Sequence, residues 1–198
     1  MNESSTTHTR TIEDADLRSA TIQVLGQRGW DGLTLERVAE VAGRARSTLW
    51  RQGWTRETLV HALTGELAAD YREAMYPVLT SGGTGRERLL SALEVLCGVL
   101  DRHLPLMLAT DEAFHRDGEA DQPPEYLQPI VQFVREGVAD GSLGPTHDVV
   151  EVADLAFNTL VWPYVHLRGR HGWESARARS GLIELVMYGI AVPSPKEG

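Results

Sequence analysis

Apolar residues recur along most of the chain at the spacing of one helical face, three and four positions apart. The first stripe consists of Leu17, Ala20, Val24 and Leu25. It predicts a helix that begins near Thr11, where Asp14 three residues later resembles a capping box. Gly29 is the expected end of this helix, because glycine accepts the left-handed backbone that closes a helix.

Shorter helical patterns follow at once. Thr34 is placed to cap a helix that Gly43 ends, and a third short helix is expected over residues 45–52 after only a tight turn. Thr55 can cap a fourth helix, whose apolar residues recur every four positions until Pro77. The first sixty residues therefore predict three packed helices and the start of a fourth.

The remainder of the chain continues the helical pattern. Further helices are expected at about 86–101, 104–116, 124–140, 147–168 and 174–191. Alternating apolar and polar runs bounded by turns, the signature of a strand, are not found. The sequence predicts an all-α fold.

Composition narrows the class of protein. Of 198 residues, 42% are hydrophobic and 24% charged, as in ordinary globular proteins. The single cysteine, Cys97, excludes an internal disulfide framework, and its apolar surroundings in sequence predict a buried thiol. We find no signal peptide and no run long enough to span a bilayer, so no membrane contact is expected and the location is expected to be cytoplasmic.

Catalytic chemistry is not indicated. The seven histidines are scattered, and no pair has the spacing of a metal centre. A glycine-rich phosphate loop and a nucleophile elbow are also missing from the sequence. We therefore expect a protein that is not an enzyme and that needs no metal and no cofactor.

Charge is distributed unevenly. Residues 1–60 hold eight arginines and eight acids, whereas residues 61–198 hold eleven basic residues and twenty acids. Between Gly43 and Arg56 there are four arginines and no acid. A strongly acidic rear part repels nucleic acid, so any such contact should be confined to the front of the chain.

The front pattern is typical of a helix-turn-helix, in which two short helices joined by a tight turn pack on a longer one. In the third helix Leu49 is expected to face inward, while Arg46, Ser47, Trp50 and Arg51 fall on the opposite side. Arginine can bind guanine with two hydrogen bonds, and hydroxyl groups can donate to phosphate. The alternative is that these arginines only form a solvated face.

These residues resemble a known family, the TetR-type bacterial transcriptional regulators. The likeness runs without gaps through "QRGWDGLTLERVAEVAGRARSTLWRQGWTRETL", and it is strong over residues 12–60 and weak beyond. The resemblance implies phosphate contacts by Thr34, Thr48, Trp50 and Arg56. It also makes Arg46 and Arg51 candidates for base or phosphate contact.

The sequence departs from the family pattern at the turn and after the third helix. Arg44 stands where a small apolar residue is usual, and Ala45 cannot cap the third helix as serine or threonine would. Gly53 replaces an aromatic residue, and Trp54 follows it. Either Trp54 fills the gap between the third and fourth helices, with Gly53 allowing the backbone to turn, or this connection is loose.

The resemblance implies that different parts of the chain have different functions. We expect an N-terminal arm at residues 1–10, a DNA-binding domain at 11–54 and a ligand-binding and dimerisation domain at 55–198, joined by the fourth helix. The implied function is a ligand-responsive repressor that binds double-stranded operator DNA as a homodimer and leaves it when a small-molecule effector binds. The alternative is a small-molecule-binding helical dimer with a degenerate helix-turn-helix that no longer reads DNA.

Two sets of residues are candidates for the rear functions. The last two helices bear broad apolar faces, which favour a four-helix dimer interface. The alternative is that both faces are internal core. The interface candidates are Val152, Ala156, Leu160, Leu182, Leu185, Val186 and Ile190. Aromatic and polar residues that could line a ligand pocket, each also explicable as core, are His103, Phe114, His115, Tyr126, Phe133, Asn158, Trp162 and His166.

Overall fold

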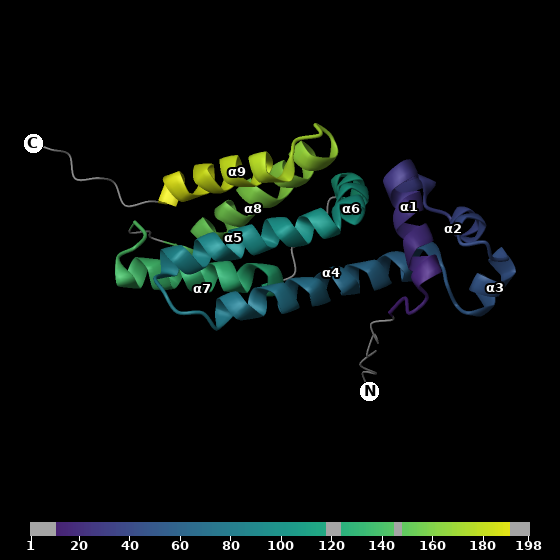
Figure 1. Cartoon of the computed structure of the whole chain (residues 1–198), viewed down its shortest axis with the longest axis horizontal. Coiled ribbons are helices and arrows are strands. Elements are labelled where there is room, and N and C mark those ends of the chain that lie inside the picture. Colours follow the sequence, from purple (N-terminus) through teal and green to yellow (C-terminus); the bar gives the residue numbers. More distant parts are fainter. Residues whose placement is uncertain (1–10, 118–123, 145–147, 191–198) are drawn as a thin grey trace, which may run out of the picture. The chain divides into compact units, whose positions relative to one another are not determined.

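The structure, a computed structural model, describes residues 11–117, 124–144 and 148–190, with side chains except at residues 112–117, 124, 125 and 190. The helices shown in Figure 1 are α1 (Ala15–Gly32), α2 (Leu35–Val41), α3 (Arg46–Arg51), α4 (Arg56–Leu79), α5 (Gly85–Arg102), α6 (Leu104–Asp117), α7 (Pro124–Asp140), α8 (Val149–Gly169) and α9 (Ser175–Ile190). The described residues contain no strand. The all-α prediction is therefore confirmed.

Helix ends follow the predicted caps with three exceptions. The backbone leaves the helical region at Gly29, which has a φ of 65°, but α1 resumes and runs to Gly32. The side chain of Asp14, not that of Thr11, caps α1 by accepting from the backbone N–H groups of Asp16 and Leu17. The start expected at Thr11 is wrong because Ile12 is buried, so the residues before Asp14 carry this side chain into the core. Helix α4 also continues through Pro77, in its last turn, to Leu79.

The chain forms two compact units that divide it differently from the expected boundary at residue 55. One unit contains residues up to Ala69 together with the segment from Pro105 onward that forms most of α6. The other contains residues 70–104 and the chain from α7 onward. Helix α4 thus contributes its first part to one unit and its last part to the other. The functions expected of the two parts stay predictions.

The first unit has one hydrophobic core, to which α1–α4 and α6 all contribute. Fully buried leucines come from successive helices and loops: Leu17, Leu33, Leu49, Leu59 and Leu63. Leu106 and Ala109 of α6 belong to the same cluster. Burial of each such side chain contributes about 1.5–3 kcal/mol to the stability of the fold, so this packing holds α1, α2 and α3 together.

The connection between α3 and α4 is tightly packed. Gly53 has a φ of 77°, and this left-handed turn lets the backbone N–H of Trp54 donate to the carbonyl of Leu49 at 3.0 Å. The Trp54 side chain is only 7% exposed and lies in the core of the first unit. Trp54 therefore fills the gap between α3 and α4, as the first of the two sequence interpretations predicts.

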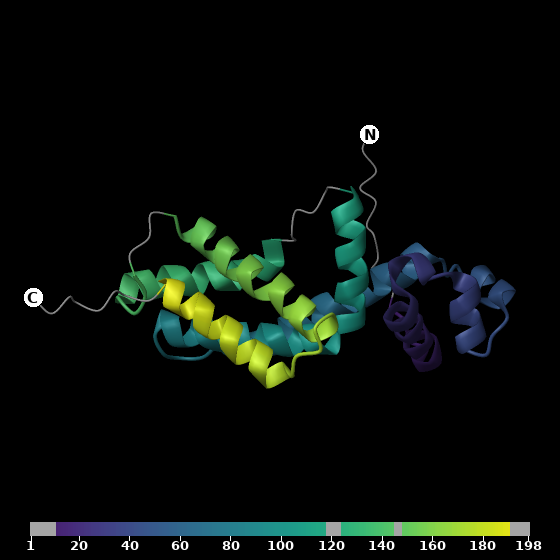
Figure 2. The same cartoon turned by 90° about the horizontal axis from the view of Figure 1, so that it is seen from above.

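The second unit is formed mainly by the packed helices α5, α7, α8 and α9. A short turn joins α8 to α9, and these two helices lie side by side in opposite directions (Figure 2). Its core includes Leu89, Leu93, Phe133, Leu160 and Tyr164. Cys97 is fully buried, and this burial raises the pKa of its thiol to about 12. The thiol is thus buried as predicted, and a thiolate is strongly disfavoured there.

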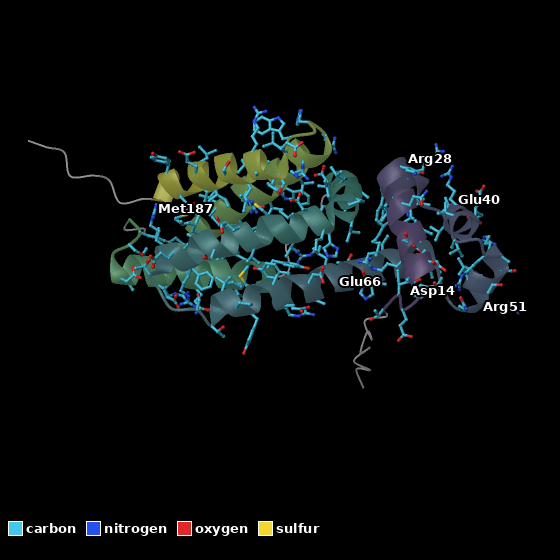
Figure 3. The ribbon with its side chains drawn as sticks, in the orientation of Figure 1. Asp14, Arg28, Glu40, Arg51, Glu66 and Met187 are labelled. Atoms are coloured by element: carbon cyan, nitrogen blue, oxygen red, sulfur yellow. The ribbon has the colours of Figure 1, made fainter. Side chains whose placement is uncertain are left out.

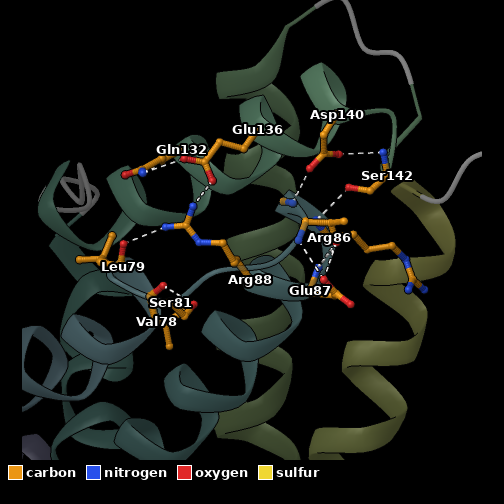
Figure 4. A network of polar contacts seen from close by, with 12 residues as sticks. Val78, Leu79, Ser81, Arg86, Glu87, Arg88, Gln132, Glu136, Asp140 and Ser142 are labelled. Atoms are coloured by element: carbon orange, nitrogen blue, oxygen red, sulfur yellow. Dashed lines mark hydrogen bonds and ion pairs between the residues drawn. The ribbon is translucent and has the colours of Figure 1, made fainter.

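The start of α5 packs very closely on the end of α7 (Figure 4). The backbone N–H groups of Gly85 and Arg86 donate to the side chains of Asp140, at 2.8 Å, and Ser142, at 3.1 Å. A Cβ atom on Gly85 would lie 2.0 Å from the backbone nitrogen of Gly137. Only glycine permits this approach.

One carboxylate ties together α5, α8 and the start of α9. Asp101 accepts hydrogen bonds from Tyr164 at 2.8 Å, Ser175 at 2.6 Å and Arg168 at 2.7 Å. Partial burial raises the pKa of Asp101, but these hydrogen bonds outweigh it, so the pKa lies below its usual value. Asp101 therefore stays ionised and holds the α8–α9 turn against α5.

Candidate nucleic-acid interface

The turn between α2 and α3 has the geometry of a helix-turn-helix. Thr34 caps α2 by accepting from the backbone N–H of Arg37 at 3.3 Å. Gly43 has a φ of 64°, and beyond it the N–H of Arg44 donates to the carbonyl of Ala39 at 2.8 Å. Ala45 precedes α3 without any side-chain hydrogen bond to the helix. The predicted cap at Thr34 and the predicted lack of a cap at Ala45 are both confirmed.

Helix α3 buries one residue and exposes most of the others. Leu49 is fully buried, Thr48 is half-buried, and the remaining side chains are exposed. The exposed residues are Arg46, Ser47, Trp50 and Arg51. Trp50 is 59% exposed, which is unusual for so large an apolar side chain, and Arg51 points away from α1 (Figure 3). The structure thus brings the predicted contact residues of α3 onto one accessible face.

Two of the four arginines between Gly43 and Arg56 are paired with acids that lie at the starts of α1 and α2. Arg44 forms an ion pair with Asp14, the residue that caps α1. Arg46 forms an ion pair with Glu36 at the start of α2. The basic stretch is therefore partly neutralised, and this was not predicted from the sequence because the pairing depends on how the helices cross.

Glu36 pairs with Arg46 on the exposed face of α3. Its pKa lies below the usual value, chiefly because its carboxylate accepts from its own backbone N–H in the first turn of α2. Arg46 and the hydroxyl of Thr34 lower the pKa further. Glu36 is thus ionised at neutral pH and forms an ion pair with Arg46, one of the residues predicted to meet DNA.

Arg56, the first residue of α4, packs on an aromatic ring. Its Cζ atom lies 4.3 Å from the ring centroid of Trp30 near the end of α1, a cation–π arrangement. Its Nε and Nη2 atoms are buried and have no hydrogen-bond partner in the described part of the chain. Trp30 was not singled out in the sequence as a site residue. No local pattern links it to a residue twenty-six positions later.

The predicted ligand residues that can be placed lie on α7, on α8 and, for His103, at the C-terminal cap of α5, and they pack against different neighbours. His103 is 6% exposed, and its Nε2 atom forms a hydrogen bond with Asp70 at 2.7 Å. Burial raises the pKa of Asp70, but the contacts with His103 and Arg102 have the larger effect, so this pKa lies below its usual value. Tyr126 packs edge-on against Tyr71 with ring centroids 5.1 Å apart.

The other predicted ligand residues also have individual surroundings. Phe133 is fully buried beneath the guanidinium of Arg88, and Asn158 donates to the carboxylate of Asp154. Trp162 and His166 are half-buried on α8, and the side chains of Phe114 and His115 lie outside the described residues. Their assignment to a ligand site stays a prediction.

A hollow of about 440 Å³ lies on the second unit between α5 and α9. Its lining includes Leu90, Ile183, Met187, Tyr188, Arg86 and Glu184. None of the six predicted ligand residues whose side chains are described lines this hollow. It is mostly apolar and broadly open to solvent.

The predicted interface residues of α8 and α9 divide into buried and accessible ones. Ala156, Leu160 and Val186 are buried within the single chain, while Val152 and Leu182 are half-buried and the side chain of Ile190 is not described. Leu185 is 61% exposed. Further exposed apolar residues on these helices are Val150, Leu155 and Tyr188. The accessible apolar surface is therefore offset from the predicted one.

Two further properties bear on the kind of site. Among the described residues, no group of three or more His, Cys, Asp or Glu side chains is arranged to hold a metal ion. No helix in the described ranges is long and apolar enough to cross a membrane.

The fold is similar to those of many solved structures, although no family model matches the sequence and no curated protein matches it. PfmR, a TetR-family regulator from Thermus thermophilus, has a TM-score of 0.72 at 13% identity, covering 88% of this chain and 98% of that one. FadR from Bacillus subtilis, a transcriptional regulator solved in complex with stearoyl-CoA, has a TM-score of 0.69 at 15% identity over 88% and 98%.

A γ-butyrolactone receptor described as ArpA-like has a TM-score of 0.66 at 18% identity and covers 92% of this chain and 89% of that one. The similarity extends over both compact units and over nearly the full length of these proteins. With its helix-turn-helix and its rear helical unit, the chain has the fold of solved TetR-family transcriptional regulators.

Proposed function

We propose that this chain is a DNA-binding transcriptional regulator that acts as a homodimer, most simply a repressor released from a near-palindromic operator by a small molecule. The observation that carries the proposal is the accessible face of α3, where Arg46, Ser47, Trp50 and Arg51 surround a helix anchored by buried Leu49. These side-chain types suit base edges and phosphates. The fold shared with solved regulators supports the same function.

Each contact residue has a proposed role. The hydroxyls of Thr34 and Ser47 and the half-buried Thr48 donate to phosphate, and Arg51 reaches a base or a phosphate. The indole N–H of Trp50 takes the place of a tyrosine hydroxyl against the DNA backbone. Arg56 has buried N–H groups without a hydrogen-bond partner, which favours an anionic oxygen as its partner in the complex.

The test is a footprint on the DNA that flanks the chain's own gene. A dimeric DNA-binding protein protects a near-palindromic sequence from cleavage, and the structure of the dimer sets the spacing of the two half-sites. Its affinity falls steeply as salt is raised, because each phosphate contact releases counterions. Absence of a protected site on this DNA and in a pool of random duplexes would refute the proposal.

A second candidate function is a ligand-binding dimer that does not read DNA. The ion pairs of Arg44 with Asp14 and of Arg46 with Glu36 favour it, because they reduce the positive charge available to DNA. The uncapped start of α3 at Ala45 also favours it. Against it, Trp54 packs α3 firmly on α4, so the reading helix is well supported. The same footprint separates the two functions.

Self-association is proposed to use the exposed apolar residues of α8 and α9. Val150, Leu155, Leu185 and Tyr188 are each more than half exposed, which is unusual for side chains of this size. Burying them against the same residues of a second copy forms an isologous interface. Sedimentation of the purified chain over a range of concentrations measures this association.

The effector is proposed to bind in the second unit. The similar structures include a regulator solved with stearoyl-CoA and a γ-butyrolactone receptor, so an acyl thioester and a lactone are the first two compounds to test. An effector acts through its different affinity for the DNA-binding and non-binding states. Helix α4 belongs to both units and is the proposed path of coupling. Operator affinity that is equal with and without each compound rejects both classes.

A further inference from the structure

The ion pair between Arg46 and Glu36 lies on the surface that is proposed to face DNA. Arg46 is the first residue of α3 and Glu36 lies in the first turn of α2, so the pair spans the two helices of the helix-turn-helix. The two side chains are 55% and 60% exposed. A pair this exposed contributes little to stability.

The contact uses one particular edge of the guanidinium. Nε of Arg46 points to Oε1 of Glu36, and Nε is the donor nearest the backbone. The Nη1 and Nη2 groups at the far end therefore remain for another partner. The Cζ atom of Arg46 also lies 6.0 Å from the ring centroid of Trp50, so the side chain is flanked on a second side.

An acid on this surface has two consequences for DNA binding. It repels phosphates, which weakens binding to every sequence alike. It also restricts the orientation of Arg46, and two parallel N–H donors at the end of an arginine match O6 and N7 of guanine in the major groove. The first effect lowers non-specific affinity, and the second favours one base.

We propose that Glu36 is a positioning residue that determines sequence specificity, because it holds Arg46 with Nη1 and Nη2 directed at a guanine in each half-site. This inference rests on the proposed DNA-binding function and specifies it: Arg46 contacts a base and not a phosphate.

The test compares Glu36→Ala with Glu40→Ala, which removes an exposed acid one turn later on the same helix. The wild-type chain first selects its preferred duplex from a random pool, and affinities are then measured for this duplex and for a scrambled one. Loss of either acid tightens binding to both duplexes. Only Glu36→Ala reduces the ratio of the two affinities, by about ten-fold, because only it frees Arg46.

Two further variants separate orientation from charge. Glu36→Gln keeps an oxygen acceptor for Arg46 and removes the charge, so binding to all duplexes tightens while the affinity ratio falls less than in Glu36→Ala. Arg46→Ala removes the preference for guanine at one position in each half-site. Replacing that guanine by 7-deazaguanine, which lacks the N7 acceptor, weakens the wild-type complex but not the complex of Arg46→Ala.

The outcomes are distinguishable. Equal affinity ratios in Glu36→Ala and Glu40→Ala would overturn the positioning role of Glu36. Uniform weakening of all sequences by Arg46→Ala would show that Arg46 contacts phosphate, and would overturn the base contact. A folded wild-type chain that selects no duplex at all would overturn the proposed function and this inference together. Circular dichroism melting of each variant verifies that it is folded.

Discussion

The guanidinium of Arg56 lies against the face of Trp30, with Cζ 4.3 Å from the ring centroid. This contact joins the start of α4 to the end of α1 and holds the cation of Arg56 beside the helix-turn-helix. Stacking on the indole uses the face of the guanidinium and none of its N–H donors, and Nε and Nη2 are buried there without a hydrogen-bond partner among the described residues. We therefore expect Trp30 to support the phosphate contact that the resemblance implies for Arg56.

We expect Arg56→Ala to weaken binding to operator and scrambled duplexes to the same extent and to reduce the salt slope by about one, as for the loss of one phosphate contact. Trp30→Ala weakens both complexes less, because Arg56 remains but is no longer held. Fluorescence anisotropy at several salt concentrations measures both effects. Arg28→Ala, an exposed arginine in the same helix as Trp30, is the control, and an equal loss in this variant would contradict the assignment.

Trp54 is buried and Trp50 is exposed, so we expect their replacement by alanine to affect different properties, stability for Trp54 and DNA binding for Trp50. Trp54→Ala should lower the free energy of unfolding of its unit by about 3–5 kcal/mol, because the side chain is 7% exposed and fills the core. Trp50→Ala should change stability by less than about 1 kcal/mol, because its side chain is 59% exposed, and should instead weaken DNA binding. Urea unfolding of both variants distinguishes them; similar destabilisation would contradict the packing.

Gly85 and Gly98 lie in the same helix and should respond oppositely to alanine. Gly85→Ala places Cβ 2.0 Å from the backbone of Gly137, which cannot move aside as a side chain can, so we expect a loss of about 3 kcal/mol. Gly98→Ala meets nothing within 4 Å and should stabilise α5 by about 0.5–1 kcal/mol. Thermal unfolding measures both changes. A harmless Gly85→Ala would mean that α5 and α7 do not approach this closely.

Tyr188 and Tyr76 test the proposed dimer surface. Tyr188 on α9 is 76% exposed and Tyr76 on α4 is 66% exposed, so both substitutions by glutamate leave the core intact. Tyr188→Glu should weaken self-association at least about ten-fold, because an unpaired carboxylate would be buried in the interface. Tyr76→Glu should leave it unchanged. Sedimentation equilibrium measures the dissociation constant of each dimer. If the dissociation constant of Tyr188→Glu equals that of the wild type, the interface lies elsewhere.

The lowered pKa of Asp101 makes the free energy of unfolding depend on pH. Its folded-state pKa lies below its usual value, so it stabilises the fold above the unfolded-state pKa of about 3.9, and this contribution is lost as the pH falls through the folded value. The free energy of unfolding should therefore fall below about pH 4. Asp101→Asn should reduce the steepness of this fall. Unfolding curves between pH 3 and pH 7 check this, and unchanged steepness would show that Asp101 contributes nothing.

Features that depend on neighbours along the chain could be predicted from the sequence alone. The spacing of Leu17 to Leu25 predicts α1, Thr34 predicts the start of α2, and Gly53 allows the turn that buries Trp54. These features are predictable because helix periodicity, capping and left-handed turns each act within a few residues. The start of α1 was placed wrongly because Thr11 and Asp14 can both cap, and the burial of Ile12 decides between them.

The charges and apolar groups that remain available for partners depend instead on how the helices pack. Helix crossing brings Glu36 to Arg46 and Trp30 under Arg56, and it places α6 in the core of the first unit. It also leaves Leu185 exposed but buries Val186, its neighbour on the same predicted face. Such contacts depend on the angle and rotation at which helices pack, and many sequence-distant side chains set these together. The sequence pattern therefore specifies the helices, while their packing decides which charged and apolar side chains are exposed.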